Sequence, residues 1–244
     1  MTRVSGQTVL VIGGSSGMGR GAARAVAARG GTVWVTSRSA GRLDAARAAV
    51  VEGLEPVDGA PVPGDVQATV CDLADPDSIR DAVLAPPALD HLVLTASPAP
   101  GGSDRDFFEG KFWGAQAACA AAAERLPAHG SILLNSGGLA VRPVRGQWAT
   151  TCAFAAVEAL ARALAVELAP RRVNCIRPGL FDTGTWAGMD PAERERFFAE
   201  TVADLPAGRP ATGEDFGDAA IGLLTSRYIT GQVVVVDGGR SVVG

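Results

Sequence analysis

The stretch "TVLVIGGSSGMGRGAARAVAARG", residues 8–30, decides how the chain folds, because an apolar strand pattern runs through a glycine turn into an amphipathic helix pattern. Its glycines include Gly13, Gly17 and Gly19. Glycines at these places allow a tight turn and let the backbone approach a pyrophosphate closely. The helix that follows would direct free N–H groups and the positive end of its dipole at that anion. The stretch therefore predicts a βα unit with a phosphate-binding turn.

The alternation of strand and helix continues to the end of the chain. Apolar runs recur between helical patterns, at 8–13, 32–37, 66–71, 91–96, 131–136, 172–177 and 232–237. Continuous apolar runs are typical of strands in a parallel sheet that is covered on both faces. Their unbroken alternation with helices predicts an α/β fold. We expect one domain over residues 1–244, a Rossmann fold whose doubly wound, seven-stranded parallel sheet carries helices on both faces.

Composition narrows the class of partner. The net charge of −4 gives no basic surface for nucleic acid or for an anionic membrane. The N-terminus has no apolar signal region, and we expect no apolar run long enough to span a bilayer. The sequence thus indicates a cytoplasmic protein that acts on a small molecule.

Cysteine and histidine give no sign of a reactive or metal centre. The spacings of Cys71, Cys119, Cys152 and Cys175 fit no zinc template, so we expect buried free thiols and no metal site. His91 and His129 each precede a predicted strand, at the edge of a parallel sheet away from the ligand crevice. Neither histidine is therefore expected to act in catalysis.

The spacing G-x-x-x-G-x-G resembles that of the short-chain dehydrogenase/reductase family, and other motifs agree. "CDL" (71–73), "PGLFDT" (178–183) and "YITGQVVVVDGG" (228–239) are similar to the family's adenine-contacting segment, its P-G-x-x-x-T motif and its last strand. The resemblance covers almost the whole chain. It implies a bound nicotinamide dinucleotide held by Gly13, Ser15, Ser16, Gly17, Met18, Gly19, Ser37, Arg38, Asp72, Leu73, Ala96, Pro178, Gly179 and Thr183.

The end of the second strand, "VTSRS", indicates which dinucleotide binds. NAD enzymes usually place an acid there to bind the ribose 2′-OH, whereas this chain has Ser37 followed by Arg38. An arginine beside the 2′ position pairs with a 2′-phosphate through charge-assisted hydrogen bonds. The sequence therefore favours NADP(H). The alternative is that Arg38 is a solvated surface residue.

The catalytic pair that the resemblance implies is missing. The family carries Y-x-x-x-K at the start of its fifth helix, where this chain has Thr150 and Phe154. The single tyrosine of this chain, Tyr228, lies just before the last strand. The chain resembles a divergent branch of the family with K-F-W-G in the fourth helix, here 111–114, and no Y-x-x-x-K. We therefore expect the helix that begins near Thr150 to be catalytically passive.

Four other polar residues are candidates for catalysis. The resemblance places Lys111 where the family has an Asn, and Ser136 close to the family's Ser, with a register uncertain by one residue against Gly137. Arg142 follows the fifth strand, and Asp182 lies beside Thr183. Such positions border the crevice where ligands bind in these folds. A surface or structural ion pair is the alternative for Lys111, Arg142 and Asp182.

These residues predict an NADP(H)-dependent oxidoreductase with a non-standard active site that reduces a small-molecule C=O or C=N (iminium) group. The alternatives are a non-redox enzyme on the same fold, of cyclase or lyase type, and a nucleotide-binding protein without turnover. The resemblance also implies a homotetramer or homodimer, because the family pairs its fourth and fifth helices across a two-fold axis. Small-residue faces such as "AQAACAAAA" (115–123) allow that approach.

Overall fold

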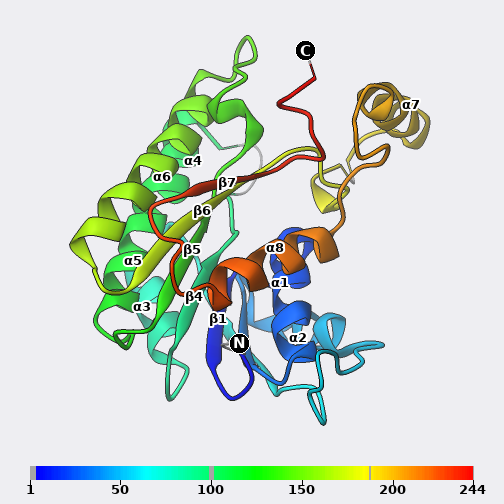
Figure 1. Ribbon diagram of the computed structural model, residues 1–244. Helices are drawn as coiled ribbons and strands as arrows, with labels where there is room; N and C mark the ends of the chain where they lie inside the picture. Colours follow the sequence, from blue (N-terminus) through cyan, green and yellow to red (C-terminus); the bar gives the residue numbers. More distant parts are fainter. Residues whose placement is uncertain (1–3, 99–101, 187, 244) are drawn as a thin grey trace.

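A computed structural model of the chain describes residues 4–98, 102–186 and 188–243. Its seven strands form one parallel sheet with the order β3-β2-β1-β4-β5-β6-β7 (Figure 1). They are β1 (Thr8–Ile12), β2 (Thr32–Ser37), β3 (Val66–Val70), β4 (His91–Leu94), β5 (Ser131–Asn135), β6 (Arg172–Pro178) and β7 (Val233–Val236). The predicted doubly wound sheet is confirmed, and each strand lies within one residue of a predicted run at its start. The strand order reverses between β1 and β4, where such sheets bind ligands.

Helices connect the strands. The α-helices are α1 (Gly17–Ala28), α2 (Leu43–Val51), α3 (Pro76–Leu84), α4 (Asp104–Phe108), α5 (Gly114–Ala123), α6 (Trp148–Glu167), α7 (Pro191–Val202) and α8 (Gly213–Thr225). One π-helical turn, η2 (Glu109–Trp113), joins α4 to α5, and 3₁₀ turns lie at η1 (Ala40–Arg42), η3 (Gly138–Ala140) and η4 (Gly184–Trp186). Asp75 and Asp190 cap α3 and α7 by accepting backbone N–H bonds, and a proline follows each cap.

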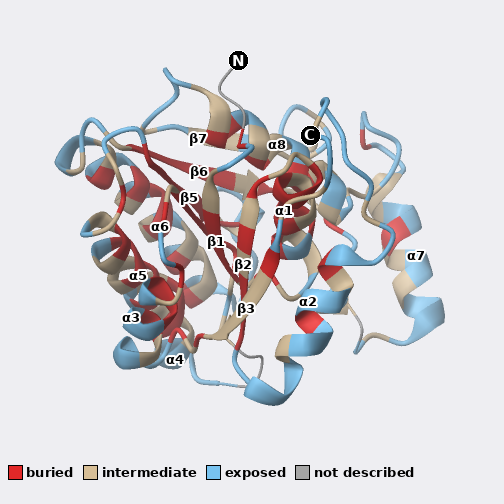
Figure 2. Ribbon diagram, turned by 90° about the horizontal axis from the view of Figure 1, so that it is seen from below, coloured by how far each residue is buried: buried red, intermediate tan, exposed pale blue. Residues whose placement is uncertain are grey.

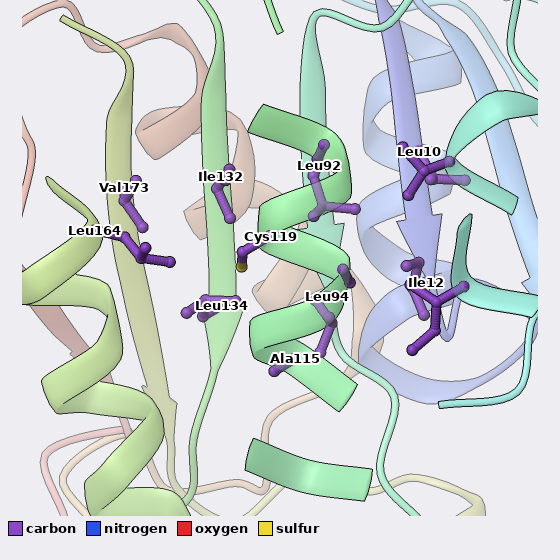
Figure 3. Packing of buried hydrophobic residues seen from close by; sticks show 14 of the residues in the cluster. Leu10, Ile12, Leu92, Leu94, Ala115, Cys119, Ile132, Leu134, Leu164 and Val173 are labelled. Carbon is purple, nitrogen blue, oxygen red and sulfur yellow. The ribbon is translucent and has the colours of Figure 1, made fainter. Parts of the chain in front are cut away.

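Helices cover both faces of the sheet. On one face α3, α5 and α6 pack against the strands, and on the other α1, α2 and α8 do so (Figures 1 and 2). Figure 3 shows Leu92 and Leu94 of β4 and Ile132 and Leu134 of β5 beside Cys119 of α5 in the first of these layers. By contrast, α7 stands away from the sheet at the edge where the strands end (Figure 1).

Glycine allows α1 and α8 to pack in direct backbone contact. A Cβ at Gly21 would lie 1.7 Å from the Gly213 carbonyl oxygen, and one at Gly217 would lie 2.6 Å from the Gly21 carbonyl oxygen. Real side chains cannot occupy such positions, so only glycine permits this helix spacing. The contact fixes α1, and with it the glycine turn that precedes α1.

Two expectations from the sequence are corrected. We expected no apolar run long enough to span a bilayer, but by length and composition α6 is such a run, because alanine, leucine and valine fill it and few charges interrupt them. This helix packs on the sheet with Val157, Ala161 and Leu164 buried. Of the four free cysteines Cys152 is exposed, since it lies on the outer face of α6.

Candidate active site

The glycine turn after β1 forms an open backbone cradle. Gly13 has a φ of +94°, and a Cβ there would lie 2.5 Å from the backbone nitrogen of Ala96. A Cβ at Gly19 would lie 2.2 Å from the Gly13 carbonyl oxygen. At the start of α1, Ser16 makes no side-chain cap bond and no acidic residue stands in the first turn. The first N–H groups of a helix lack intrahelical partners, so this terminus can receive an anion.

Neighbouring strand ends complete the cradle. The Gly13 N–H donates to the Thr36 hydroxyl of β2 at 3.1 Å, which ties the turn to the end of that strand. Ser37 is buried beside it, whereas Arg38 is exposed. After β6, the Thr183 side chain lies 3.2 Å from where a Gly17 Cβ would be. The predicted cofactor residues on β1, β2, β4 and β6 therefore meet at one edge of the sheet.

The remaining predicted cofactor residues also follow strand ends. Asp72 comes directly after β3 and Cys71, and its N–H donates to the Ser78 hydroxyl at 3.0 Å. Leu73 is buried against α5, since a Cβ at Gly114 would lie 2.5 Å from the Leu73 carbonyl oxygen. Pro178 ends β6. Gly179 packs against the backbone of Asp237, since a Cβ at Gly179 would lie 2.6 Å from the Asp237 Cα atom.

Lys111 is the only lysine in the sequence, and its side chain is 0% exposed. It lies in η2, and π-helical turns of this kind are frequent at functional sites. Its Nζ donates to the Ala96 carbonyl and to the Ser97 hydroxyl after β4, both at 3.3 Å. Among the described residues it forms no ion pair within 4.0 Å. Burial lowers the pKa of Lys111 to about 8.

Phe154 occupies the space in front of this ammonium group. The Lys111 Nζ lies 5.5 Å from the centre of the Phe154 ring, within the range of a cation–π contact. On the same ring, a Cβ at Gly137 would lie 2.3 Å from Cε2, so Gly137 leaves the space that the phenyl group fills. Phe107 packs edge-on against it with ring centres 6.0 Å apart. The ring is thus an apolar wall between Lys111 and the end of β5.

Ser136 is not available to a substrate in this arrangement. Its side chain is 2% exposed, and its hydroxyl donates to Glu158 Oε1 of α6 at 2.8 Å. Glu158 is also held by two bonds from Arg177 of β6, at 2.7 and 2.6 Å. A buried carboxylate needs such a partner. We therefore leave Ser136 out of the proposed catalytic set and assign it to this structural network.

Asp182 lines a cavity of about 510 Å³, which lies between the first turns of α1, the start of α8 and residues 182–186 and 189–194. Its carboxylate forms an ion pair with Arg194 of α7. Trp186 donates from Nε1 to the Phe181 carbonyl at 2.9 Å and packs against Phe197, with ring centres 4.9 Å apart. These contacts hold α7 over the cavity.

Arg142 lies apart from the other candidates. Its guanidinium donates to the Arg240 carbonyl at 3.2 Å, and it borders a small cavity of about 50 Å³ with Arg177 and Asp237. Lys111 lines neither this cavity nor the larger one. The structure therefore does not gather Lys111, Arg142 and Asp182 into one constellation.

Several residues of this region were not singled out from the sequence. Ser97 and Arg194 have no sequence signal beyond their positions after β4 and in α7, because their roles depend on which distant side chain reaches them. The sequence identified Phe154 as the residue in place of the family's lysine, but its contact with Gly137 depends on the packing of α6 on β5. Glu158 could have been suspected as a charge on the apolar face of a helix.

Comparisons with known proteins agree with this fold. The family profile described as "Enoyl-(Acyl carrier protein) reductase" matches residues 12–241. The short-chain dehydrogenase/reductase ATR9 of Stachybotrys chlorohalonatus is 30% identical, with 98% of each chain covered. A crystal structure of a small-chain dehydrogenase in complex with NADPH is 30% identical, with a TM-score of 0.76 and with 97% of this chain and 99% of that chain covered.

A further likeness concerns the fold alone. The MalC reductase/Diels-Alderase of Malbranchea aurantiaca superposes with a TM-score of 0.87 and 98% coverage of each chain, at 24% identity. The family profile spans nearly the whole chain, and ATR9 matches from end to end. The chain therefore belongs to the short-chain dehydrogenase/reductase family.

Proposed function

We propose that the protein is an NADP(H)-dependent reductase with a non-standard active site, which reduces a C=O or C=N (iminium) group of a small molecule. The observation that carries the proposal is Lys111. The chain places its single lysine, fully buried, at the carboxyl end of β4, where ligands bind in such sheets. A buried cation without a carboxylate partner in the described part of the chain is costly to a fold. Such a cost points to function.

The residues fit the cofactor. The cradle at Gly13 and Gly19 has room for no side chain, as close approach of a pyrophosphate requires. Arg38 is exposed at the end of β2, where it can meet a 2′-phosphate. The related small-chain dehydrogenase binds NADPH according to its name. These observations support NADP(H) as the cofactor of this chain.

The chain's own residues would divide the work by charge. When bound, the reduced nicotinamide supplies a hydride. A ketone then gains negative charge on oxygen, which the Lys111 ammonium stabilises. An iminium acceptor already carries positive charge, and the Asp182 carboxylate, at the cavity under α7, would stabilise that cation. Arg142 is a second candidate cation, but its place at the smaller cavity gives it a role only for a substrate that reaches there.

In this proposal no residue of α6 takes over the work of the missing Tyr and Lys, and groups on other elements act in their place. Thr150 donates to the side chain of Gln147 at 3.2 Å, and a Thr hydroxyl has no accessible pKa near neutrality. Phe154 has no proton to give, but its ring excludes water near Lys111. A low local dielectric strengthens the remaining charge.

The wider setting is part of the proposal. We infer a cytoplasmic enzyme that assembles as a homotetramer or homodimer and binds neither nucleic acid nor membrane. The acidic net charge of −4 supports the absence of nucleic-acid partners. The apolar outer face of α6, with Trp148 and Val166 exposed, supports assembly.

A screen of NADPH oxidation tests the proposal. The wild type is mixed with NADPH and a panel of cyclic ketones and N-alkylated cyclic iminium salts matched in ring size, and absorbance of NADPH is followed. We expect turnover with at least one class. Lys111→Met should lower ketone reduction on the order of 10²-fold, whereas Thr150→Ala should stay within about twofold of the wild type.

Other outcomes would overturn it. NADPH that binds but is not oxidised by any compound would favour a non-redox enzyme or a protein without turnover. The name of the MalC neighbour joins a reductase to a Diels-Alderase, so cyclisation of each panel compound should be followed by mass and retention time in the same samples. Loss of turnover in Thr150→Ala, with Lys111→Met unaffected, would return the active site to α6.

A further inference from the structure

Ser97 links the buried Lys111 to the end of β4. It follows Ala96, whose backbone nitrogen lies 2.5 Å from the ideal Cβ position of Gly13 in the phosphate-binding turn. The sheet order reverses between β1 and β4, so this residue lies at the switch point of the fold. Lys111 is completely buried, but Ser97 is exposed. The two are joined by the bond from Nζ to the Ser97 hydroxyl oxygen at 3.3 Å.

The direction of this hydrogen bond matters. An ammonium group only donates, so the Ser97 oxygen is the acceptor and its own proton is left to point elsewhere. The other acceptor of Lys111 is the Ala96 carbonyl, which has no proton to pass on. Phe154 closes the third side with a ring. Of these three neighbours, therefore, only the Ser97 hydroxyl can take a proton from Lys111 and pass its own proton on.

We propose that Ser97 is a catalytic residue, the proton donor to the substrate oxygen in ketone reduction, and that Lys111 re-protonates it. The inference rests on the proposed function. As hydride from the reduced nicotinamide reaches the carbonyl carbon, the C=O π pair moves onto oxygen. The Ser97 O–H bond breaks and an O–H bond forms on the product alcohol. A Lys111 N–H bond then breaks to restore the Ser97 hydroxyl, and a proton from solvent returns to the buried amine through the exposed Ser97 hydroxyl.

The charges around Lys111 suit this role. Burial lowers its pKa to about 8, which brings proton release close to neutral pH. The titratable group that faces it from β6 is Cys175, whose pKa burial raises to about 11, so that side chain stays a neutral thiol. From α6 it meets the Phe154 ring, and from the end of β4 a carbonyl and a hydroxyl. Lys111 thus titrates without a close carboxylate among the described residues.

The test compares two substrate classes in one enzyme. Ketone reduction needs a proton, but reduction of a permanent, N-alkylated iminium salt needs none. Using the panel described above, Ser97→Ala should lower kcat for ketones on the order of 10²-fold and leave iminium reduction within about twofold. Ser97→Thr, which keeps the hydroxyl, should recover most of the ketone activity. Thr150→Ala is the matched loss of a hydroxyl in the same region and should change neither class.

The pH dependence of kcat distinguishes a proton-donating Ser97 from a merely structural one, because replacing a structural serine would leave that dependence unchanged. In the wild type, kcat for ketones should fall as pH rises through about 8, since Lys111 must be protonated. That limb should vanish in Ser97→Ala. Because the chain has one lysine, lysine labelled with ¹³C and ¹⁵N gives one side-chain NMR signal, and its titration midpoint identifies the group directly.

The outcomes separate the proton relay from Lys111 through Ser97 to the substrate from the proposed function. Equal losses of ketone and iminium reduction in Ser97→Ala, or ketone reduction that survives it, would overturn the relay and leave the reductase standing. Reduction of iminium salts alone would also overturn the relay. If no compound of the panel oxidised NADPH, both the proposed reductase and the relay would be overturned.

Discussion

Lys111 carries a positive charge into a place where charge is unfavourable. Its partners are one carbonyl, one hydroxyl and the face of a phenyl ring, and its side chain is buried completely. In the folded protein burial lowers the lysine pKa from its ordinary value of 10.5 to about 8. Between these two values the folded state binds fewer protons than the unfolded state. Stability contributed by this residue therefore rises with pH across that window.

We predict that Lys111→Met stabilises the protein at pH 7. The lowered pKa corresponds to a cost on the order of 3 kcal/mol, because each unit of pKa is worth about 1.4 kcal/mol. Thermal unfolding should show a higher Tm for the variant at about pH 7, and the difference should shrink toward about pH 10. Arg105→Met removes an exposed cation and should change Tm little at either pH. A variant less stable than the wild type at pH 7 would show that the ammonium group is well compensated.

Arg38 is the residue on which, in our proposal, the choice of dinucleotide depends. It is exposed at the end of β2, next to the buried Ser37, and no acid precedes it to bind a ribose hydroxyl. Arg38→Ala should weaken NADPH binding by roughly 10- to 100-fold, since a hydrogen bond to a charged group contributes about 1.5–3 kcal/mol. NADH binding should change little. Fluorescence titration of both nucleotides checks this, with Arg47→Ala on α2 as the matched loss of an exposed arginine; equal wild-type affinities would refute the role.

At the scale of elements, the contact between α1 and α8 is the tightest point of the fold. The two helices touch through Gly21, Gly213 and Gly217, where added side chains would overlap backbone atoms. Since α1 begins in the glycine turn after β1, a change in helix spacing would move the proposed phosphate cradle. Stability and nucleotide affinity are therefore linked through this contact.

Gly21→Ala should test that link. Its methyl group would meet the Gly213 carbonyl at 1.7 Å, so the helices must separate, at a cost of roughly 1–3 kcal/mol or more. Urea unfolding should show the loss, and NADPH affinity should fall with it. Gly222→Ala lies in α8 with open space around its Cβ and should be neutral or stabilising by roughly 0.5–1 kcal/mol. Similar unfolding of the two variants would show that the contact is more tolerant than its geometry.

The elements also show what sequence patterns can and cannot predict. The strands and the caps at Asp75 and Asp190 follow from local signals, because apolar period and capping chemistry act between near neighbours. The approach of Lys111 to Ser97, and the pairing of Asp182 with Arg194, join residues whose meeting depends on how whole helices pack. The fold was thus predictable, together with the sheet edge at which the candidate cofactor residues lie, but the orientation of the candidate catalytic groups was not.

At the scale of the whole molecule, α6 leaves an apolar surface without a cover in the single chain. Trp148 is 66% exposed and Val166 is 80% exposed. Apolar surface of this kind on a helix indicates an interface. A closed symmetric assembly would cover it with the same face of a second copy.

We expect light scattering at micromolar concentration to give a tetramer, four times the chain mass of 24.8 kDa, or a dimer. Val166→Glu should shift that mass toward the monomer, because a charge would be buried in the shared face. Val62→Glu, at another exposed valine on the loop before β3, should leave the mass unchanged. A wild-type monomer would contradict the assembly.

Because the only lysine in the sequence is buried, its chemical modification can report local opening of the structure. A soluble amine reagent can modify Lys111 only while the structure around η2 and the end of β4 is briefly open, since no part of that side chain meets solvent otherwise. The rate of modification of one residue then reports how often this edge of the sheet opens, as amide exchange does for the backbone. A nucleotide that binds at this edge of the sheet should lower the rate at which Lys111 is modified.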